Sequence, residues 1–136
     1  MPIKLKKDSI DLGIVTANGA AMVAFYRDVL GFTEEPQTPF PFGGVMYRLR
    51  CGTSLIKIVE PTPAPSERAP GGGIPTATGY RYWTISVSNL KELVADCTKA
   101  GRKLVVPVTE VRPGVTIAIV EDPDGNLVEF LDVVAA

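Results

Sequence analysis

The sequence predicts an α+β fold in which two βαβββ modules form a cupped, mixed β-sheet with helices on its outside. Two observations predict this class. Two separate segments carry apolar residues at helical spacing, and each is preceded by one extended segment and followed by three. The two sets also repeat at a nearly constant offset along the chain. Because one half-sheet with one helix leaves its other face bare, two copies can curl together and enclose a cavity.

The first predicted module spans about residues 9–60. Alternating residues over Ile10–Thr16 predict a strand, and Asn18 is a residue type that favours the N-cap of a helix. An amphipathic helix then runs to Gly31, which ends it. Its apolar positions, which we expect in the core, are Met22, Phe25, Tyr26, Val29 and Leu30. Three extended segments follow, at residues 32–35, 45–50 and 54–60.

The second predicted module spans about residues 79–134 and repeats this order. A strand over Arg81–Val87 leads to Asn89, and a helix runs from there to Gly101. Extended segments follow at residues 103–106, 115–121 and 127–133. Asn89 lies 71 positions after Asn18, Gly101 lies 70 after Gly31, and the segment NLVEFLD lies 72 after SLIKIVE. These steady offsets indicate an internal duplication.

The segment between the modules, residues 61–78, contains five prolines and three consecutive glycines. This composition predicts a linker or surface loop. We expect one domain over residues 1–136, made of the two modules and this linker.

Composition excludes several classes of function. The formal net charge is -1 and no basic block is present, so we expect no nucleic-acid partner. No apolar run is long enough for a membrane span, and we expect a cytoplasmic protein with no membrane partner. Two cysteines, Cys51 and Cys97, form neither a disulfide framework nor a CxxC site, and neither stands out as a nucleophile. The chain has no histidine, which excludes a Ser-His-Asp triad, a Cys-His pair and an imidazole-ligated zinc site.

Two motifs, AFYRDVLGF at Ala24–Phe32 and EDPDGNLVEFLD at Glu121–Asp132, resemble the vicinal oxygen chelate superfamily of glyoxalases, bleomycin resistance proteins and extradiol dioxygenases. The resemblance covers roughly residues 9–134, and it implies the paired βαβββ fold and a homodimer. The second motif also reads as a tight turn, in which Pro123 presets φ and Asp124-Gly125 supplies left-handed positions. We expect that turn to be its main role.

Metal-dependent members of this superfamily place one ligand on the first strand and one on the last strand of each module, usually histidines and glutamates. The resemblance puts Asp11, Lys57, Tyr82 and Glu129 at these four positions, and only Glu129 matches the family pattern. Tyr82 lies 71 positions after Asp11, and Glu129 lies 72 after Lys57, so the repeat supports the same two pairs. Strand alternation predicts that all four face away from the helices, toward the cavity.

An ammonium group repels a cation and offers no lone pair, so we expect no metal and no cofactor, with a weak Mg, Mn or Ca site as the alternative. Lys57 would replace the metal's charge between Asp11 and Glu129 and keep both ionised. A carboxylate could then take a proton or activate water while Lys57 and Tyr82 stabilise an oxyanion. The other interpretation is an ion network that does no chemistry.

Three further residues are candidates for binding a substrate. Phe40 and Phe42, in a proline-rich loop, could form a lid over an apolar ligand or simply pack on their own module. Arg48 could enter the cavity and pair with an anionic ligand group, or face solvent.

Together these features predict a protein that binds a small organic ligand. The preferred function is a metal-independent isomerase, lyase or hydrolase that uses carboxylate acid/base chemistry. The alternatives are a non-catalytic binding protein of the bleomycin resistance type and a weakly Mg- or Mn-dependent, glyoxalase-like enzyme.

Overall fold

The computed structural model describes residues 1–134 and divides the chain into two compact units, Met1–Ser66 and Glu67–Ala136. The boundary falls inside the proline- and glycine-rich segment 61–78. Each unit contains one four-stranded mixed sheet and one main helix.

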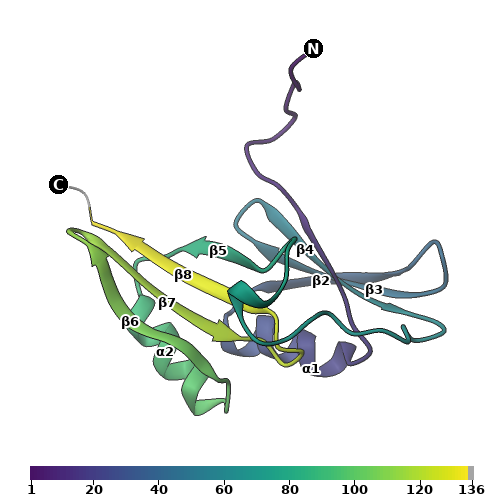
Figure 1. The fold of residues 1–136 in the computed structure, drawn as a ribbon. Coiled ribbons are helices and arrows are strands. Elements are labelled where there is room, and N and C mark those ends of the chain that lie inside the picture. The colour runs from purple at the N-terminus through teal and green to yellow at the C-terminus, as the bar shows by residue number, and fades with distance from the viewer. Residues whose placement is uncertain (135–136) are drawn as a thin grey trace. The chain divides into compact units, whose positions relative to one another are not determined.

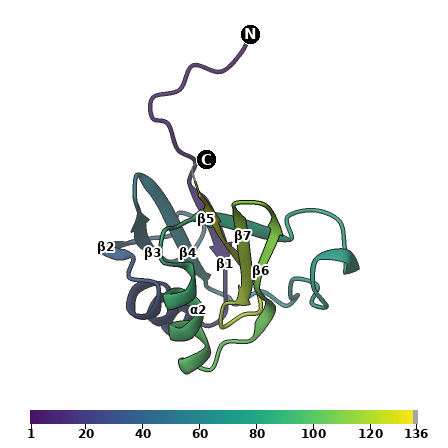
Figure 2. The same ribbon diagram turned by 90° about the vertical axis from the view of Figure 1, so that its left-hand side faces the viewer.

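The first unit follows the order strand, helix, three strands (Figure 1). Its elements are β1 (Leu12–Val15), α1 (Gly19–Ala24), the π-helical turn η1 (Phe25–Val29), β2 (Thr33–Pro39), β3 (Gly44–Cys51) and β4 (Ser54–Pro61). The sheet order is β1-β4-β3-β2, with β1 parallel to β4 and the other pairs antiparallel. The N-terminal end of the segment before β1 is exposed and extends away from the sheet (Figure 2).

The second unit repeats the order after a short 3-10 turn, η2 (Ile74–Thr76). Its elements are β5 (Tyr82–Ser86), α2 (Leu90–Lys99), β6 (Leu104–Arg112), β7 (Val115–Glu121) and β8 (Leu127–Val133). The sheet order is β5-β8-β7-β6, again with one parallel pair, β5 with β8. The predicted α+β class with two βαβββ modules is confirmed.

The two sheets share the same strand register, as a duplication requires. In the parallel pair of the first unit Gly13 is the partner of Lys57, and in that of the second unit Thr84 is the partner of Glu129. Thr84 lies 71 positions after Gly13 and Glu129 lies 72 after Lys57, which are the offsets seen in the sequence. Residues related by the sequence repeat therefore occupy equivalent positions in the parallel strand pairs of the two units.

The apolar stripe of each predicted helix packs against its own sheet. Tyr26 and Met22 are fully buried, and the rings of Phe25 and Phe32 lie 4.9 and 5.6 Å from that of Tyr26. Leu90, Val94 and Cys97 are the buried residues of α2. The FYRDVLG segment is therefore core structure at its aromatic positions, because burial of these rings stabilises the helix on the sheet.

The N-terminus of α1 is not capped by the side chain that the sequence predicts. Asn18 is at the N-cap position but its side chain makes no capping hydrogen bond, and the same is true of Asn89 at α2. In α1 the cap comes from another element, because Glu60 Oε1 on β4 accepts a hydrogen bond of 3.1 Å from the Gly19 backbone N–H. A carboxylate at this position also complements the positive end of the helix.

The EDPDGN segment is held as a turn by the buried Asp122. Its Oδ1 accepts 2.9 Å hydrogen bonds from the backbone N–H groups of Asp124 and Asn126, and the Asn126 side-chain amide donates to both carboxylate oxygens. Gly125 has a φ of 88°, whereas Asp124 does not adopt a positive φ. The expectation of two left-handed positions is thus wrong at Asp124, because side-chain hydrogen bonding to Asp122 closes the turn with one.

Arg81 holds the second half of the segment between the modules through hydrogen bonds. The guanidinium of Arg81 donates hydrogen bonds to the backbone oxygens of Pro70, Gly71 and Gly73 and to Thr76 Oγ1. One side chain thereby satisfies the carbonyls of a segment that has no strand partner. Among residues 1–134, no helix is both long and apolar enough to cross a membrane.

Candidate functional site

In the first unit the sheet has one face covered by α1 and one that carries the predicted site residues. A Cβ atom at Gly19 would meet Glu60 and Tyr47, which places the start of α1 on the face that also carries Ile56 and Ile58. We call the opposite face the helix-free face of the first unit. By strand alternation and register its residues are Asp11, Gly13, Val15, Thr33, Glu35, Thr38, Met46, Arg48, Arg50, Leu55, Lys57 and Val59.

Asp11 is bound to partners other than the expected Lys57. Its Oδ1 accepts a 2.7 Å hydrogen bond from Lys7 Nζ and a 2.8 Å hydrogen bond from the Leu55 backbone N–H. These two donors lower the pKa of the Asp11 carboxyl below its ordinary value of 3.8, and the charge of Lys57 contributes least. Asp11 therefore fastens the start of β1 to β4, and its low basicity makes it a weak proton acceptor.

Lys57 lies at the middle of the helix-free face. Its neighbour on β1 is Gly13 and its neighbour on β3 is Arg48. The side chain is partly exposed. Within residues 1–134, no carboxylate forms an ion pair with its ammonium group.

Arg48 and Arg50 both lie on the helix-free face, where each pairs with a carboxylate of the chain. Arg48 Nη2 lies 3.2 Å from Glu35 Oε1, and Arg50 Nε lies 2.5 Å from Glu35 Oε2. Arg50 and Arg48 lower the pKa of the Glu35 carboxyl, and Glu35 raises the pKa of Arg50. A single carboxylate thus serves two guanidinium groups.

Phe40 and Phe42 lie at the tip of the hairpin between β2 and β3. Their ring centroids are 5.4 Å apart, and Phe42 is 85% exposed. Gly44, where β3 begins beside this tip, is four residues from Arg48, or about 13 Å along an extended strand. The structure therefore places these aromatic residues at the far end of β3, away from Lys57.

In the second unit the predicted pair occupies the matching face of its sheet. Tyr82 and Glu129 alternate with the helix-side residues Trp83 and Phe130, and Tyr82 is 49% exposed. Thr84 Oγ1 donates a 2.7 Å hydrogen bond to Glu129 Oε1. Sequence reasoning missed Thr84, although its position two residues after Tyr82 puts it on the same face of the strand.

Sequence reasoning also missed Lys7, the ammonium partner of Asp11, and Glu35, the carboxylate partner of Arg48. Lys7 lies before the first strand and Glu35 is on the β2 edge, so no motif marks them. Their roles depend on strand pairing, which brings Glu35 opposite Arg48.

The residues at the family's metal-ligand positions do not fit a divalent cation in the first unit. Lys57 supplies an ammonium group, which has no lone pair, and Asp11 Oδ1 already accepts hydrogen bonds from Lys7 and Leu55. The second unit offers a phenol and one carboxylate that already accepts the Thr84 hydroxyl. Within the described residues 1–134, no group of three or more Asp, Glu, Cys or His side chains is arranged to hold a metal ion.

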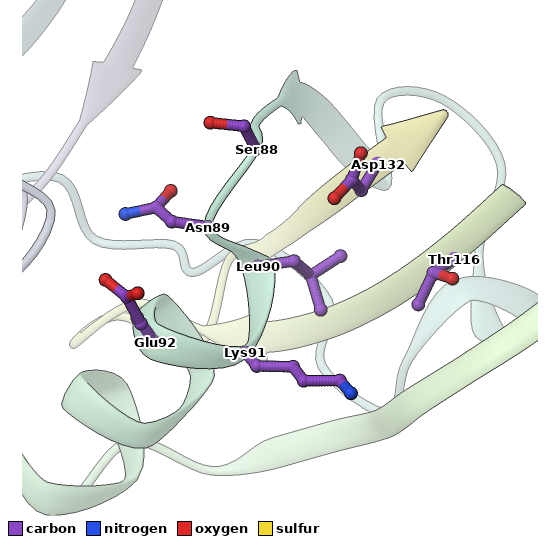
Figure 3. Close-up of a pocket in the computed structure, with 7 residues that line it drawn as sticks. All are labelled: Ser88, Asn89, Leu90, Lys91, Glu92, Thr116 and Asp132. Carbon is purple, nitrogen blue, oxygen red and sulfur yellow. The ribbon is translucent and has the colours of Figure 1, made fainter. Parts of the chain in front are cut away.

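A separate open pocket of about 290 Å³ lies at the start of α2 in the second unit. Asp132 on β8 and Thr116 on β7 lie across from residues 88–92 of the helix start (Figure 3). Two carboxylates, Glu92 and Asp132, line it, and they oppose the binding of an anion to the helix N-terminus. None of the predicted site residues lines this pocket.

Comparisons with known proteins agree with the fold. Residues 10–130 match the family model of the Glyoxalase/Bleomycin resistance protein/Dioxygenase superfamily. The search of curated proteins found no match. Among solved structures, a glyoxylase/bleomycin resistance protein/dioxygenase domain from Frankia sp. EAN1pec is 17% identical, with a TM-score of 0.76 and coverage of 98% of this chain and 96% of that one.

Two other solved structures are similar at comparable identity. TioX from Micromonospora sp. ML1 is 21% identical, with a TM-score of 0.70 and coverage of 94% of this chain and 100% of that one. The trypanothione-dependent glyoxalase I of Leishmania major is 22% identical, with a TM-score of 0.69 and coverage of 90% and 84%. At these identities the structures support the fold alone. The family model spans nearly all of the sequence, and the chain belongs to the glyoxalase/bleomycin resistance protein/dioxygenase superfamily.

Proposed function

We propose that this protein binds a small organic molecule without a bound metal, using the helix-free faces of its sheets. The observation that carries the proposal is the ammonium group of Lys57. It occupies a position where metal-dependent family members have a ligand, and it is partly exposed and has no ion-pair partner among residues 1–134. An ammonium group donates three hydrogen bonds and accepts none, so it binds the oxygen atoms of a ligand and not a cation.

A second candidate function, acid/base catalysis, is favoured by the hydrogen bond between Thr84 and Glu129. The hydroxyl fixes one carboxylate oxygen of Glu129 and leaves the other available on a face that also carries Tyr82. Glu129 would take a proton from a carbon next to a carbonyl, and the Tyr82 hydroxyl would donate to the oxyanion that forms. An isomerase or lyase reaction needs these two roles. We assign Asp11 a structural role in this scheme, because its carboxyl is a weak base.

The first test is metal content, because it separates this proposal from a metal-dependent enzyme. Protein purified without chelator is analysed by elemental mass spectrometry before and after incubation with Mg, Mn, Fe, Co, Ni or Zn. We expect less than stoichiometric metal in every case. Stoichiometric metal that is lost in the Glu129→Gln variant would overturn the proposal and make a metal-dependent, glyoxalase-like enzyme the leading candidate.

Binding and catalysis are then separated with a small-molecule library. Compounds that raise the melting temperature are incubated with the protein and analysed by mass spectrometry for conversion. Conversion that is lost in Glu129→Gln, with binding retained, identifies an enzyme. Binding without conversion identifies a sequestering protein of the kind that the family's bleomycin resistance members represent.

We also propose that the chain assembles as a homodimer, from its membership of the family. Analytical ultracentrifugation tests this, since a sedimenting species of 14.5 kDa at micromolar concentration would contradict it.

A further inference from the structure

We infer that the first unit holds the anionic group of an organic ligand, a carboxylate or a phosphate monoester, between Lys57 and Arg48. The inference rests on the proposed small-molecule binding and names the chemical class of the ligand. It concerns the helix-free face of the first unit alone.

Lys57 and Arg48 are directly opposite each other on β4 and β3. Like charges at directly opposed positions of an antiparallel pair destabilise a sheet. Arg48 is compensated by Glu35 at 3.2 Å, but Glu35 also serves Arg50, and Lys57 has no carboxylate partner among the described residues. An anion placed between the two cationic groups would remove this repulsion and form charge-assisted hydrogen bonds.

The charge balance of the face points the same way. Its charged residues and their partner Lys7 are four cations, Lys7, Arg48, Arg50 and Lys57, and two carboxylates, Asp11 and Glu35. Four positive charges less two negative charges leave a formal +2 on this face, in a chain whose net charge is -1. Such a concentration of one sign attracts ligands of the opposite sign.

In the second unit, the position equivalent to Lys57 has a hydrogen-bonding partner within the chain. In the second unit Thr84 fills the place of Gly13 and hydrogen-bonds Glu129, which fills the place of Lys57. In the first unit a Cβ atom at Gly13 would have no heavy atom of the described chain within 4 Å. Lys57 therefore has open space on its Gly13 side, where Glu129 in the second unit has the Thr84 hydroxyl.

The neighbouring row of residues on the same face indicates that the rest of the ligand is apolar. Val15, Val59 and Met46 are partners across β1, β4 and β3, two residues further along the strands. This apolar row lies about 7 Å from the Lys57 row. An acid with an aromatic or short aliphatic body spans that distance, with its charge at Lys57 and its apolar part on the exposed Val15 and the half-buried Met46.

The test uses three related probes, benzoate, phenyl phosphate and the neutral benzamide, in titrations at low salt followed by amide NMR spectra of isotope-labelled protein. We expect both anions to shift the amide signals of Gly13, Lys57 and Val59, and benzamide to leave them unchanged. Lys57→Gln should weaken anion binding about tenfold or more, the loss of one charge-assisted hydrogen bond. Lys57→Arg should retain binding, and Lys99→Gln on α2 is the matched control.

Equal shifts with benzamide, or unchanged binding in a folded Lys57→Gln variant, would overturn the inference. Should Lys57→Gln not fold, Arg48→Gln tests the other side of the same pair. A neutral library compound that binds while both anions fail would refute the anion site and leave the proposed function intact. If no compound binds at all, the proposed function fails as well.

Discussion

The Thr84 hydroxyl donates a 2.7 Å hydrogen bond to Glu129 across the β5–β8 pair. The corresponding β1–β4 pair joins Gly13 to Lys57, and glycine has no side chain to donate. The two units have the same strand order and register, yet Glu129 is hydrogen-bonded within its unit, whereas Lys57 has no ion-pair partner among residues 1–134. This asymmetry leaves the first unit with the cation that an anionic ligand would bind.

The first prediction concerns the repulsion at the proposed site. Lys57→Gln should raise the free energy of unfolding by about 0.2–1 kcal/mol in the absence of ligand, because it removes a like charge opposite Arg48. Urea denaturation at low salt measures this difference, and added salt should reduce it by screening. Lys57→Arg keeps the charge and should show no gain. A destabilised Lys57→Gln protein would show that the ammonium has a structural partner.

A second prediction separates two glycines of the first unit. Gly19→Ala should destabilise the fold by about 1 kcal/mol or more, because its Cβ would lie 2.2 Å from Glu60 Oε1 and displace the helix cap. Gly13→Ala is the control, since its Cβ meets nothing within 4 Å and its φ is not positive. That change should be neutral or stabilising, by up to about 1 kcal/mol. Equal losses in both variants would contradict the cap.

The pH dependence of stability should include a contribution from Asp11. Hydrogen bonds from Lys7 and Leu55 lower its pKa in the folded state below the ordinary value of 3.8. The stabilisation is therefore present above pH 3.8 and is lost as the pH falls through the lowered value. Unfolding measured between pH 7 and pH 2.5 should show a smaller loss in Asp11→Asn than in the wild type. Identical pH profiles would show that these hydrogen bonds do not form in solution.

The two thiols should react slowly with a disulfide reagent in the native state. Burial raises the pKa of both, and it raises that of Cys97 to about 11, with a further increase from Asp96. Cys97 is fully buried, whereas Cys51 is partly exposed, so Cys51 should react first and Cys97 only on unfolding. Thiol titration at pH 8 of Cys51→Ser and Cys97→Ser assigns each phase. Rapid reaction of Cys97 in folded protein would contradict its inert role.

The sequence alone predicted the fold because its signals are local and occur twice. Apolar spacing from Met22 to Leu30 and the turn at Pro123–Gly125 each depend on neighbouring residues, and the offsets of 70–72 duplicate them. Strand parity is also local, and the strand register puts Lys57, Tyr82 and Glu129 on the faces opposite the helices. The hydrogen-bond and ion-pair partners of these groups, by contrast, cannot be predicted from neighbouring residues in the sequence.

Only the tertiary structure decided the partners of these groups. Asp11 is held by Lys7 and Leu55 and not by Lys57, and Glu60 caps a helix that begins 41 positions earlier at Gly19. Such pairings depend on strand order and register, which bring together atoms far apart in the chain. The sequence by itself determined the family, the two modules and the absence of histidine ligands. That Lys57 has no ion-pair partner among residues 1–134 is evident only from the assembled sheet, because pairing of a charge depends on its neighbours in space.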